Sequence, residues 1–205
     1  MLTIWGRENS SNVKKVLWLV EELSLPYELI KAGGQFGMLD DPAYRALNPN
    51  GLIPTIRDGD FVLWESNAII RYLIAQYGGD LQIEDTKEQA AADKWLDWSS
   101  TAFIPAFRDP FWNLVRATPE QRNPEAIAKG VAACTRLLGI VDEALKTQPY
   151  LSGQRFGAGD IALGCFVYPW FEIPMGDAPL PHVRAWYERL KERPAYRKAV
   201  AIPIT

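Results

Sequence analysis

The chain has 205 residues, of which 48% are hydrophobic, and its formal net charge is −3. This composition can bury a sizeable core, and the acidic balance argues against a general nucleic-acid binder, which would carry a basic excess. A single histidine and two cysteines outside any C-x-x-C motif exclude a His-rich metal site and a dithiol redox motif. We therefore expect no metal and no organic cofactor. Since no apolar run approaches the ~20 residues that span a bilayer, we also expect no membrane partner. The two cysteines, Cys134 and Cys165, are far apart in the chain, so a disulfide framework is not expected and a cytoplasmic location is.

The first part of the chain alternates between strand and helix patterns. Apolar residues recur with a 3.6-residue period in the helical segments, and short apolar runs bounded by glycine or proline indicate strands. The predicted elements, in chain order, are strand 2–5, helix 13–23, strand 27–30, helix 43–47, strands 54–58 and 61–65, and helix 66–77. The helix between the first two strands implies parallel pairing, and Asp58-Gly59-Asp60 turns the last two strands into a hairpin.

A polar linker at residues 78–86 follows, and every later segment has a helical pattern. The expected helices cover residues 87–115, 124–145, 158–171 and 183–191. The fold class is therefore α/β plus all-α, with one domain at residues 1–80 and a helical domain at residues 87–205. Lys14 and Lys15, within the first helix, are expected on a solvated face.

Polar residues at the start of the first helix are the first candidate site. Ser10, Ser11 and Asn12 precede its apolar residues. Free N–H groups and the helix dipole favour an anion there, and a serine hydroxyl that donates to a thiolate lowers the thiol pKa from about 8.5. The alternative is ordinary N-capping, the commonest use of Ser and Asn at this position.

The second candidate is the segment N-P-N-G-L-I-P at residues 48–54. A cis Ile53–Pro54 bond would turn the chain sharply and leave the Ile53 backbone groups unpaired, ready to pair with a bound peptide. The alternative is a trans proline that opens an edge strand, and the low frequency of cis bonds favours it from position alone.

The third candidate is W-E-S-N-A-I, where the last strand becomes a helix. Ser66 can cap that helix, whose N–H groups can bind a carboxylate, and Glu65 can accept from an ammonium group. The alternative is a helix cap beside a solvated charge. Together, the three candidates describe a site for a zwitterionic peptide that carries a thiol.

Four stretches resemble the cytosolic glutathione transferases in order and spacing across almost the whole chain. They are S-S-N-V-K-K-V, N-P-N-G-L-I-P, W-E-S-N-A-I-I-R-Y-L and G-A-G-D-I-A-L-G. The resemblance implies a thioredoxin-like N-terminal domain that binds glutathione, a helical domain that contributes the electrophile pocket, and a homodimer. Glutathione is then a co-substrate.

The resemblance also favours a bacterial serine-type member, theta/beta-like or nu-like. Trp5, Gly6 and Arg7 stand where tyrosine-type members carry their tyrosine, and no cysteine begins the first helix. Ser10 occupies the place of the activating serine. Asn12 matches an asparagine that related bacterial and fungal proteins place near the sulfur, so Ser11 and Asn12 remain alternatives.

Further substrate-binding residues are expected in two places. Gln35 lies in the glycine-rich loop that follows the second strand. In the helical domain, Phe107, Arg108 and Trp112 belong to an aromatic-rich stretch that can line an apolar pocket, although ordinary helix packing explains it equally well.

One residue of the helical domain departs from the family pattern. Gly157 stands three residues before Asp160, where relatives carry Ser or Thr, so the reciprocal capping box is expected to be lost.

The expected activity is conjugation of the glutathione thiolate to a hydrophobic electrophile. The alternatives are a glutathione-dependent disulfide reductase or peroxidase, suggested by Asn12, and a non-catalytic glutathione-binding scaffold.

Overall fold

The computed structural model describes residues 1–176 and 178–205, which divide into two compact units. The first unit comprises Met1–Gln82 and Pro194–Ile202, and the second comprises Ile83–Arg193 and Pro203–Thr205. The sequence placed residues 194–202 with the helical domain, but in the structure they pack on the first unit. The contact is specific, since the rings of Trp18 and Tyr196 meet edge to face with centroids 4.7 Å apart.

A small mixed sheet forms the centre of the first unit, as the sequence predicted. Its strands are β1 (Leu2–Gly6), β2 (Tyr27–Lys31), β3 (Thr55–Asp58) and β4 (Phe61–Trp64). Their order is β2-β1-β3-β4, with β1 parallel to β2 and the other neighbours antiparallel. The predicted crossover and hairpin are therefore both confirmed.

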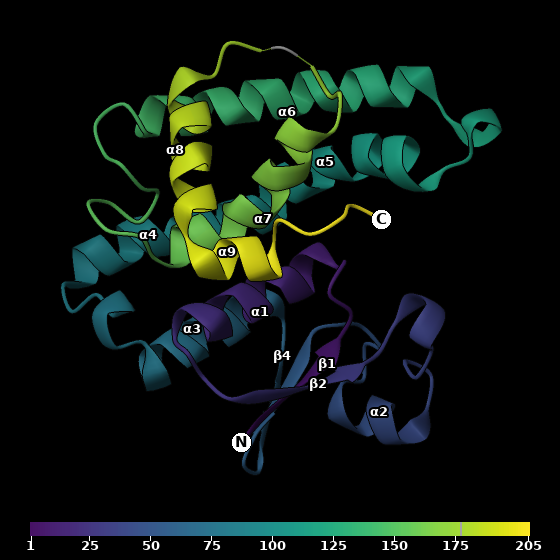
Figure 1. Ribbon diagram of the computed structural model, residues 1–205, viewed down its shortest axis with the longest axis vertical. Coiled ribbons are helices and arrows are strands. Elements are labelled where there is room, and N and C mark those ends of the chain that lie inside the picture. Colours follow the sequence, from purple (N-terminus) through teal and green to yellow (C-terminus); the bar gives the residue numbers. More distant parts are fainter. Residues whose placement is uncertain (177) are drawn as a thin grey trace. The chain divides into compact units, whose positions relative to one another are not determined.

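The helices of this unit cover both faces of the sheet. They are α1 (Ser11–Glu22), α2 (Pro42–Leu47), α3 (Ser66–Tyr77) and α9 (Pro194–Ala199). Helices α1 and α3 pack against each other on one side of the sheet (Figure 1). On the opposite face, Trp5 packs with Ala32 and with Tyr44 of α2. Alternate residues of β1 thus serve two cores, because successive side chains of a strand point to opposite faces.

Helix α1 is buried on nearly every side, so the prediction of a solvated face at Lys14 and Lys15 was wrong. Lys14 is 5% exposed and Lys15 is 0% exposed. Lys14 Nζ donates to the carbonyl oxygen of Val200 at 2.8 Å, and Lys15 Nζ donates to Asn67 Oδ1 of α3 at 3.1 Å. The C-terminal segment and α3 therefore cover the part of α1 that the sequence left to solvent.

The second unit is helical, as predicted. Its α-helices are α4 (Thr86–Trp98), α5 (Ile104–Phe111), α6 (Pro124–Ala144), α7 (Ala158–Glu172) and α8 (Pro181–Glu192). Two π-helical turns, Ser99–Phe103 and Trp112–Arg116, flank α5, so the expected helix 87–115 is a run of consecutive segments. Helices α5 and α6 approach closely because Gly130 lacks a Cβ, which would stand 2.4 Å from the ring of Pro110.

Asp160 organises the start of α7. It is fully buried and accepts hydrogen bonds from the backbone N–H groups of Leu151 at 2.8 Å and Gly157 at 3.0 Å. Ser152 Oγ accepts from Gly159 N at 3.0 Å and so takes the place of the N-cap hydroxyl that Gly157 cannot offer. A Cβ on Gly157 would stand 2.9 Å from that oxygen. Half of the capping box is therefore retained, and the other half comes from the preceding loop.

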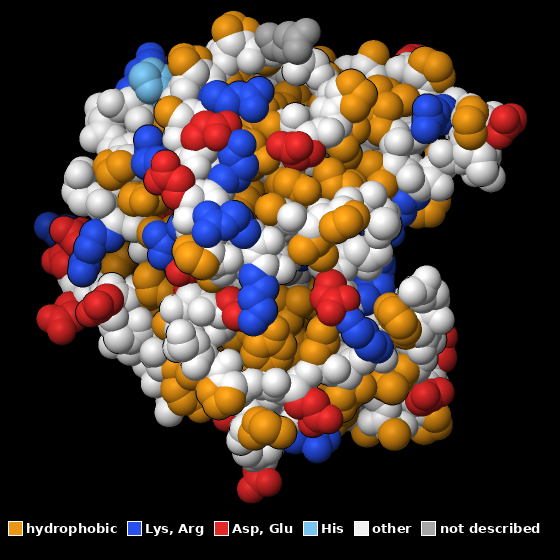
Figure 2. Space-filling view, in the orientation of Figure 1, with side chains coloured by type: hydrophobic (Ala, Val, Ile, Leu, Met, Phe, Trp, Pro, Cys, Tyr) orange, Lys and Arg blue, Asp and Glu red, His pale blue; other side chains and the backbone are white. Residues whose placement is uncertain are grey.

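The face of the molecule drawn in Figure 2 carries side chains of both charges. Along α8, acidic and basic side chains alternate, as Figure 2 shows for the face that it draws, and Lys191 pairs with Glu188 at 2.8 Å. Within the described parts of the chain, no helix has both the length and the apolar character needed to cross a membrane.

Candidate functional site

The start of α1 holds the residues predicted to meet the sulfur. Ser10 is the N-cap residue by its backbone, with extended φ and ψ of −86° and 121°, and its carbonyl accepts from Lys14 N at 2.8 Å. Its side chain makes no capping hydrogen bond. Ser10, Ser11 and Asn12 are all half-buried. N-capping, the alternative raised from the sequence, therefore does not account for the Ser10 hydroxyl.

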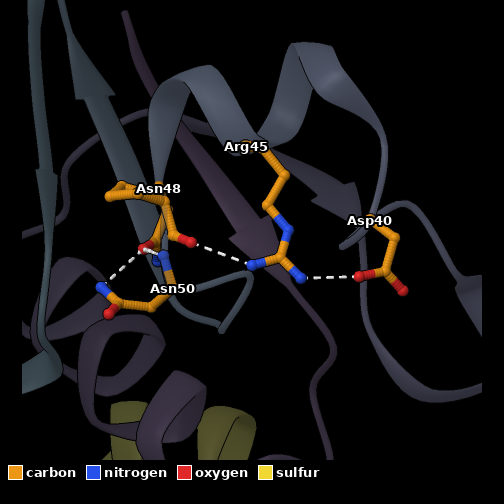
Figure 3. A network of polar contacts seen from close by, with 5 residues as sticks. Asp40, Arg45, Asn48 and Asn50 are labelled. Atoms are coloured by element: carbon orange, nitrogen blue, oxygen red, sulfur yellow. Dashed lines mark hydrogen bonds and ion pairs between the residues drawn. The ribbon is translucent and has the colours of Figure 1, made fainter.

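The loop before β3 is held by a polar network at the end of α2. Arg45 donates to Asp40 Oδ1 at 2.6 Å and to the Pro49 carbonyl at 2.9 Å. Asn50 donates to Asn48 Oδ1 through both its backbone and its side-chain nitrogen, each at 3.0 Å (Figure 3). This network fixes the loop from one side, so the residues that follow it have a defined path into the sheet.

The other end of this loop carries Ile53 and Pro54. The Ile53–Pro54 bond is cis, the form that sequence position alone did not favour. Tyr44 Oη and Asn48 Nδ2 both donate to the Leu52 carbonyl, at 2.6 and 2.9 Å. The ladder of β3 begins only at Thr55, so the backbone of Ile53 lies outside the sheet pairing.

The junction of β4 and α3 differs from the prediction in one respect. Ser66 was expected to be able to cap α3, but the N-cap position belongs to Glu65, whose side chain makes no capping hydrogen bond. Glu65 has a φ of +72° and is exposed. A non-glycine residue in this region is uncommon and is found preferentially at functional sites, where surrounding structure enforces it.

Ser66 links this junction to the start of α1. It is 7% exposed, and its Oγ donates to Asn12 Oδ1 at 3.3 Å. Lys15 Nζ lies 3.4 Å from the same Oγ and donates to it. The predictions from sequence missed Lys15. The available signal was the unbroken apolar run at residues 16–20, because a helix that is hydrophobic all round is a buried one.

Sheet register brings the predicted glutathione residues to one end of the sheet. Trp5 lies opposite Thr55, and Thr55 lies opposite Trp64, so the segments that follow β1 and β4 meet the segment that precedes β3. Gly6 pairs with Lys31, which places the loop of Gln35 at the same end. Gln35 is exposed in a short 3₁₀ turn, Gly34–Phe36.

The predicted residues of the helical unit separate into core and surface. Phe107 is 3% exposed, and its ring packs against Phe103 and Phe166 with centroids 5.6 and 5.8 Å away. Helix packing, the alternative raised for this stretch, describes Phe107. Arg108 is exposed, and Trp112 is 56% exposed. Among residues 1–176 and 178–205, no group of three or more His, Cys, Asp or Glu side chains is arranged to hold a metal ion.

Comparisons with known proteins match both parts of the chain. Residues 9–76 match the family model of the glutathione S-transferase N-terminal domain, and residues 124–189 match that of the C-terminal domain. The chain is 47% identical over 208 residues to glutathione S-transferase GstB of Escherichia coli, with 100% of both chains covered. It is 32% identical to glutathione S-transferase 3 of Zea mays, over 99% of this chain and 95% of the relative.

Among solved structures, the theta class glutathione S-transferase of Xanthomonas axonopodis pv. citri with glutathione bound superposes with a TM-score of 0.97. It is 52% identical and covers 100% of this chain and 99% of its own. Glutathione transferase F7 of Populus trichocarpa is more distant, with 27% identity, 98% coverage of both chains and a TM-score of 0.90. Matches to both domain models and to a full-length relative at this identity lead to one conclusion: the chain belongs to the glutathione S-transferase family.

Proposed function

We propose that the chain transfers the glutathione thiolate to a hydrophobic electrophile. One observation carries this proposal: the polar residues predicted to bind glutathione lie at one end of the sheet. There, the Ser10 hydroxyl makes no capping hydrogen bond, and Ser66 donates a hydrogen bond to Asn12. Family membership supports the same reading, as does the Xanthomonas relative, whose structure holds glutathione.

In this proposal, Ser10 donates a hydrogen bond to the glutathione sulfur. Stabilising the thiolate lowers the thiol pKa and raises the population of the nucleophile at neutral pH. The N-terminus of α1 adds its dipole to the same effect. Ser11 and Asn12 are the alternatives for this role, since both are half-buried at the same turn.

The remaining contacts hold the glutathione backbone. The Ile53 backbone, outside the sheet ladder, pairs with the cysteinyl part of the peptide. Ser66 binds the carboxylate of the γ-glutamyl end, Glu65 accepts from its ammonium group, and Gln35 contributes from the neighbouring loop. These contacts fix the sulfur in place, and positioning together with thiolate stabilisation supplies the rate acceleration.

For the electrophile, we propose contacts from exposed residues of the helical unit. Trp112 offers an apolar ring, and Arg108 offers a cation for an anionic intermediate. No metal or organic coenzyme enters the proposed reaction, because a thiolate attacks an electrophilic carbon directly.

Retention on immobilised glutathione, followed by assays with aryl-halide, disulfide and peroxide substrates, tests this function. Retention with aryl-halide turnover supports the transferase, and turnover confined to disulfides or peroxides supports the reductase alternative. Retention without turnover of any substrate supports a glutathione-binding scaffold. A chain that glutathione does not retain would contradict all three.

Ser66→Ala is expected to weaken glutathione binding by about ten- to a hundredfold, because one hydrogen bond to a charged group is lost. Isothermal titration calorimetry measures this change. Because Glu65 and not Ser66 is the N-cap residue of α3, we expect the substitution to carry no capping penalty. An affinity within twofold of the wild type would place the carboxylate elsewhere.

We also propose that the chain forms a homodimer, on the basis of family resemblance. Sedimentation equilibrium at micromolar concentration is expected to give twice the 23.1 kDa mass of one chain. A mass near that of one chain would contradict the proposal.

A further inference from the structure

A fully buried lysine stands behind the proposed carboxylate site. Lys15 belongs to α1 and is 0% exposed, and α1 packs against α3. Its Nζ donates to Ser66 Oγ at 3.4 Å and to Asn67 Oδ1 at 3.1 Å. Both acceptors belong to the first turn of α3, where the N–H groups of the helix are exposed to an anion. The ammonium group and the helix N-terminus thus place positive charge on the same spot.

The chemistry of the ammonium group fixes the direction of the hydrogen bonds. An ammonium group can only donate, so the Ser66 oxygen accepts from Lys15 and the hydroxyl hydrogen is directed elsewhere. In the structure that hydrogen goes to Asn12 Oδ1, 3.3 Å away. Lys15 therefore makes Ser66 a donor toward the start of α1. A carboxylate oxygen is a stronger acceptor than an amide oxygen and would take the same hydrogen bond.

We propose that Lys15 is a positioning residue for the carboxylate at the γ-glutamyl end of glutathione, acting through the Ser66 hydroxyl. This inference rests on the proposed function. Lys15 holds the Ser66 oxygen so that its hydrogen faces the carboxylate, and its buried charge attracts the anion through the protein interior, where charges are screened less than in water. Exposed Glu65 remains on the outer side for the ammonium group of the same zwitterion.

The adjacent Lys14 provides a matched control. It is also buried, at 5% exposure, but its Nζ donates to the Val200 carbonyl of the C-terminal segment. Lys15→Met and Lys14→Met remove the same group from neighbouring positions of one helix. Calorimetry is expected to show glutathione binding weakened about tenfold or more by Lys15→Met, and changed by less than about twofold by Lys14→Met.

A double-mutant cycle separates positioning from a general loss of structure. If Lys15 acts through Ser66, adding Lys15→Met to Ser66→Ala is expected to cost less than half of what it costs in the wild type. In steady-state kinetics, KM for glutathione is expected to rise while kcat at saturating glutathione stays within about threefold. A lysine with a purely structural role would not raise KM for glutathione while leaving kcat almost unchanged.

Three results would overturn the inference: equal affinities in the two methionine variants, additive losses in the cycle, or a loss confined to kcat. If Lys15→Met does not fold, Lys15→Gln removes the charge and offers an amide oxygen that can accept the Ser66 hydrogen, and a loss of less than about threefold in glutathione affinity would be equally contrary. Wild-type protein that binds no glutathione would instead refute the proposed function. Failure of the inference alone leaves wild-type binding intact.

Discussion

Asp160→Asn is expected to lower the free energy of unfolding by about 3–5 kcal/mol, a larger effect than most single substitutions have. The carboxylate is fully buried, and its Oδ1 accepts from Leu151 N and from Trp186 Nε1, each at 2.8 Å. Its Oδ2 accepts from Gly157 N at 3.0 Å and Ser152 N at 3.3 Å. Burial raises the pKa of Asp160, and these donors oppose the rise by stabilising the charged form. An asparagine amide would turn an NH₂ group toward N–H donors.

Asp142→Asn is the control for this prediction. Asp142 is also buried, and in the described parts of the chain its hydrogen bonds run to Oδ1 alone, from the N–H groups of His182 and Val183 at the start of α8. Asparagine keeps that oxygen, so the expected cost is below about 1 kcal/mol. Urea denaturation followed by circular dichroism measures both variants. Equal losses at the two positions would contradict the hydrogen-bond argument.

Ser10→Ala is expected to lower turnover with an aryl-halide acceptor by about a hundredfold or less, with little change in glutathione affinity. The hydroxyl bonds to the charged thiolate, and such a bond is worth about 1.5–3 kcal/mol. Removing it raises the thiol pKa of bound glutathione, so the rate profile is expected to move to higher pH, because the thiolate is the reactive form. Stopped-flow and steady-state rates across pH measure this shift.

The same substitution is expected to leave stability almost unchanged. Removing an N-cap side chain usually costs about 1 kcal/mol, but the side chain of Ser10 makes no capping hydrogen bond. Ser11→Ala and Asn12→Ala serve as comparisons, since both lie in the first turn of α1. If Asn12→Ala abolishes turnover while Ser10→Ala is silent, the sulfur contact belongs to Asn12.

Local sequence pattern was sufficient to predict the four strands and most of the helices, but it missed α9 (Pro194–Ala199) and did not divide the expected helix 87–115. Helix α3 was predicted at residues 66–77 and is found at Ser66–Tyr77, because its apolar residues recur at the helical period and glycines follow it. The parallel pairing of β1 with β2 followed from the crossover helix, and the antiparallel pairing of β3 with β4 followed from the Asp58-Gly59-Asp60 turn, but the pairing of β1 with β3 was not predicted. These features depend on residues that are neighbours in the chain, so they can be predicted from a single sequence.

The site residues could be proposed from spacing and resemblance, but their partners could not. Ser66 was expected to be able to cap α3, whereas in the structure Glu65 takes the N-cap position with a φ of +72° and Ser66 meets Asn12 and Lys15. The cis form of Ile53–Pro54 was likewise undecided by position. Each outcome depends on which distant segments pack together around these backbones.

The sequence by itself determined the strands, most of the helices and the polar residues at their ends, because hydrophobic period and turn residues act over a few positions. Only the tertiary structure decided which groups Lys14 and Lys15 of α1 meet. The apolar run at residues 16–20 indicates a buried helix, but it does not show that Val200 returns from the far end of the chain to accept from Lys14. Asn67 of α3 accepts from Lys15 on another side. A buried ammonium group needs acceptors, and contacts between segments far apart in the chain supply them.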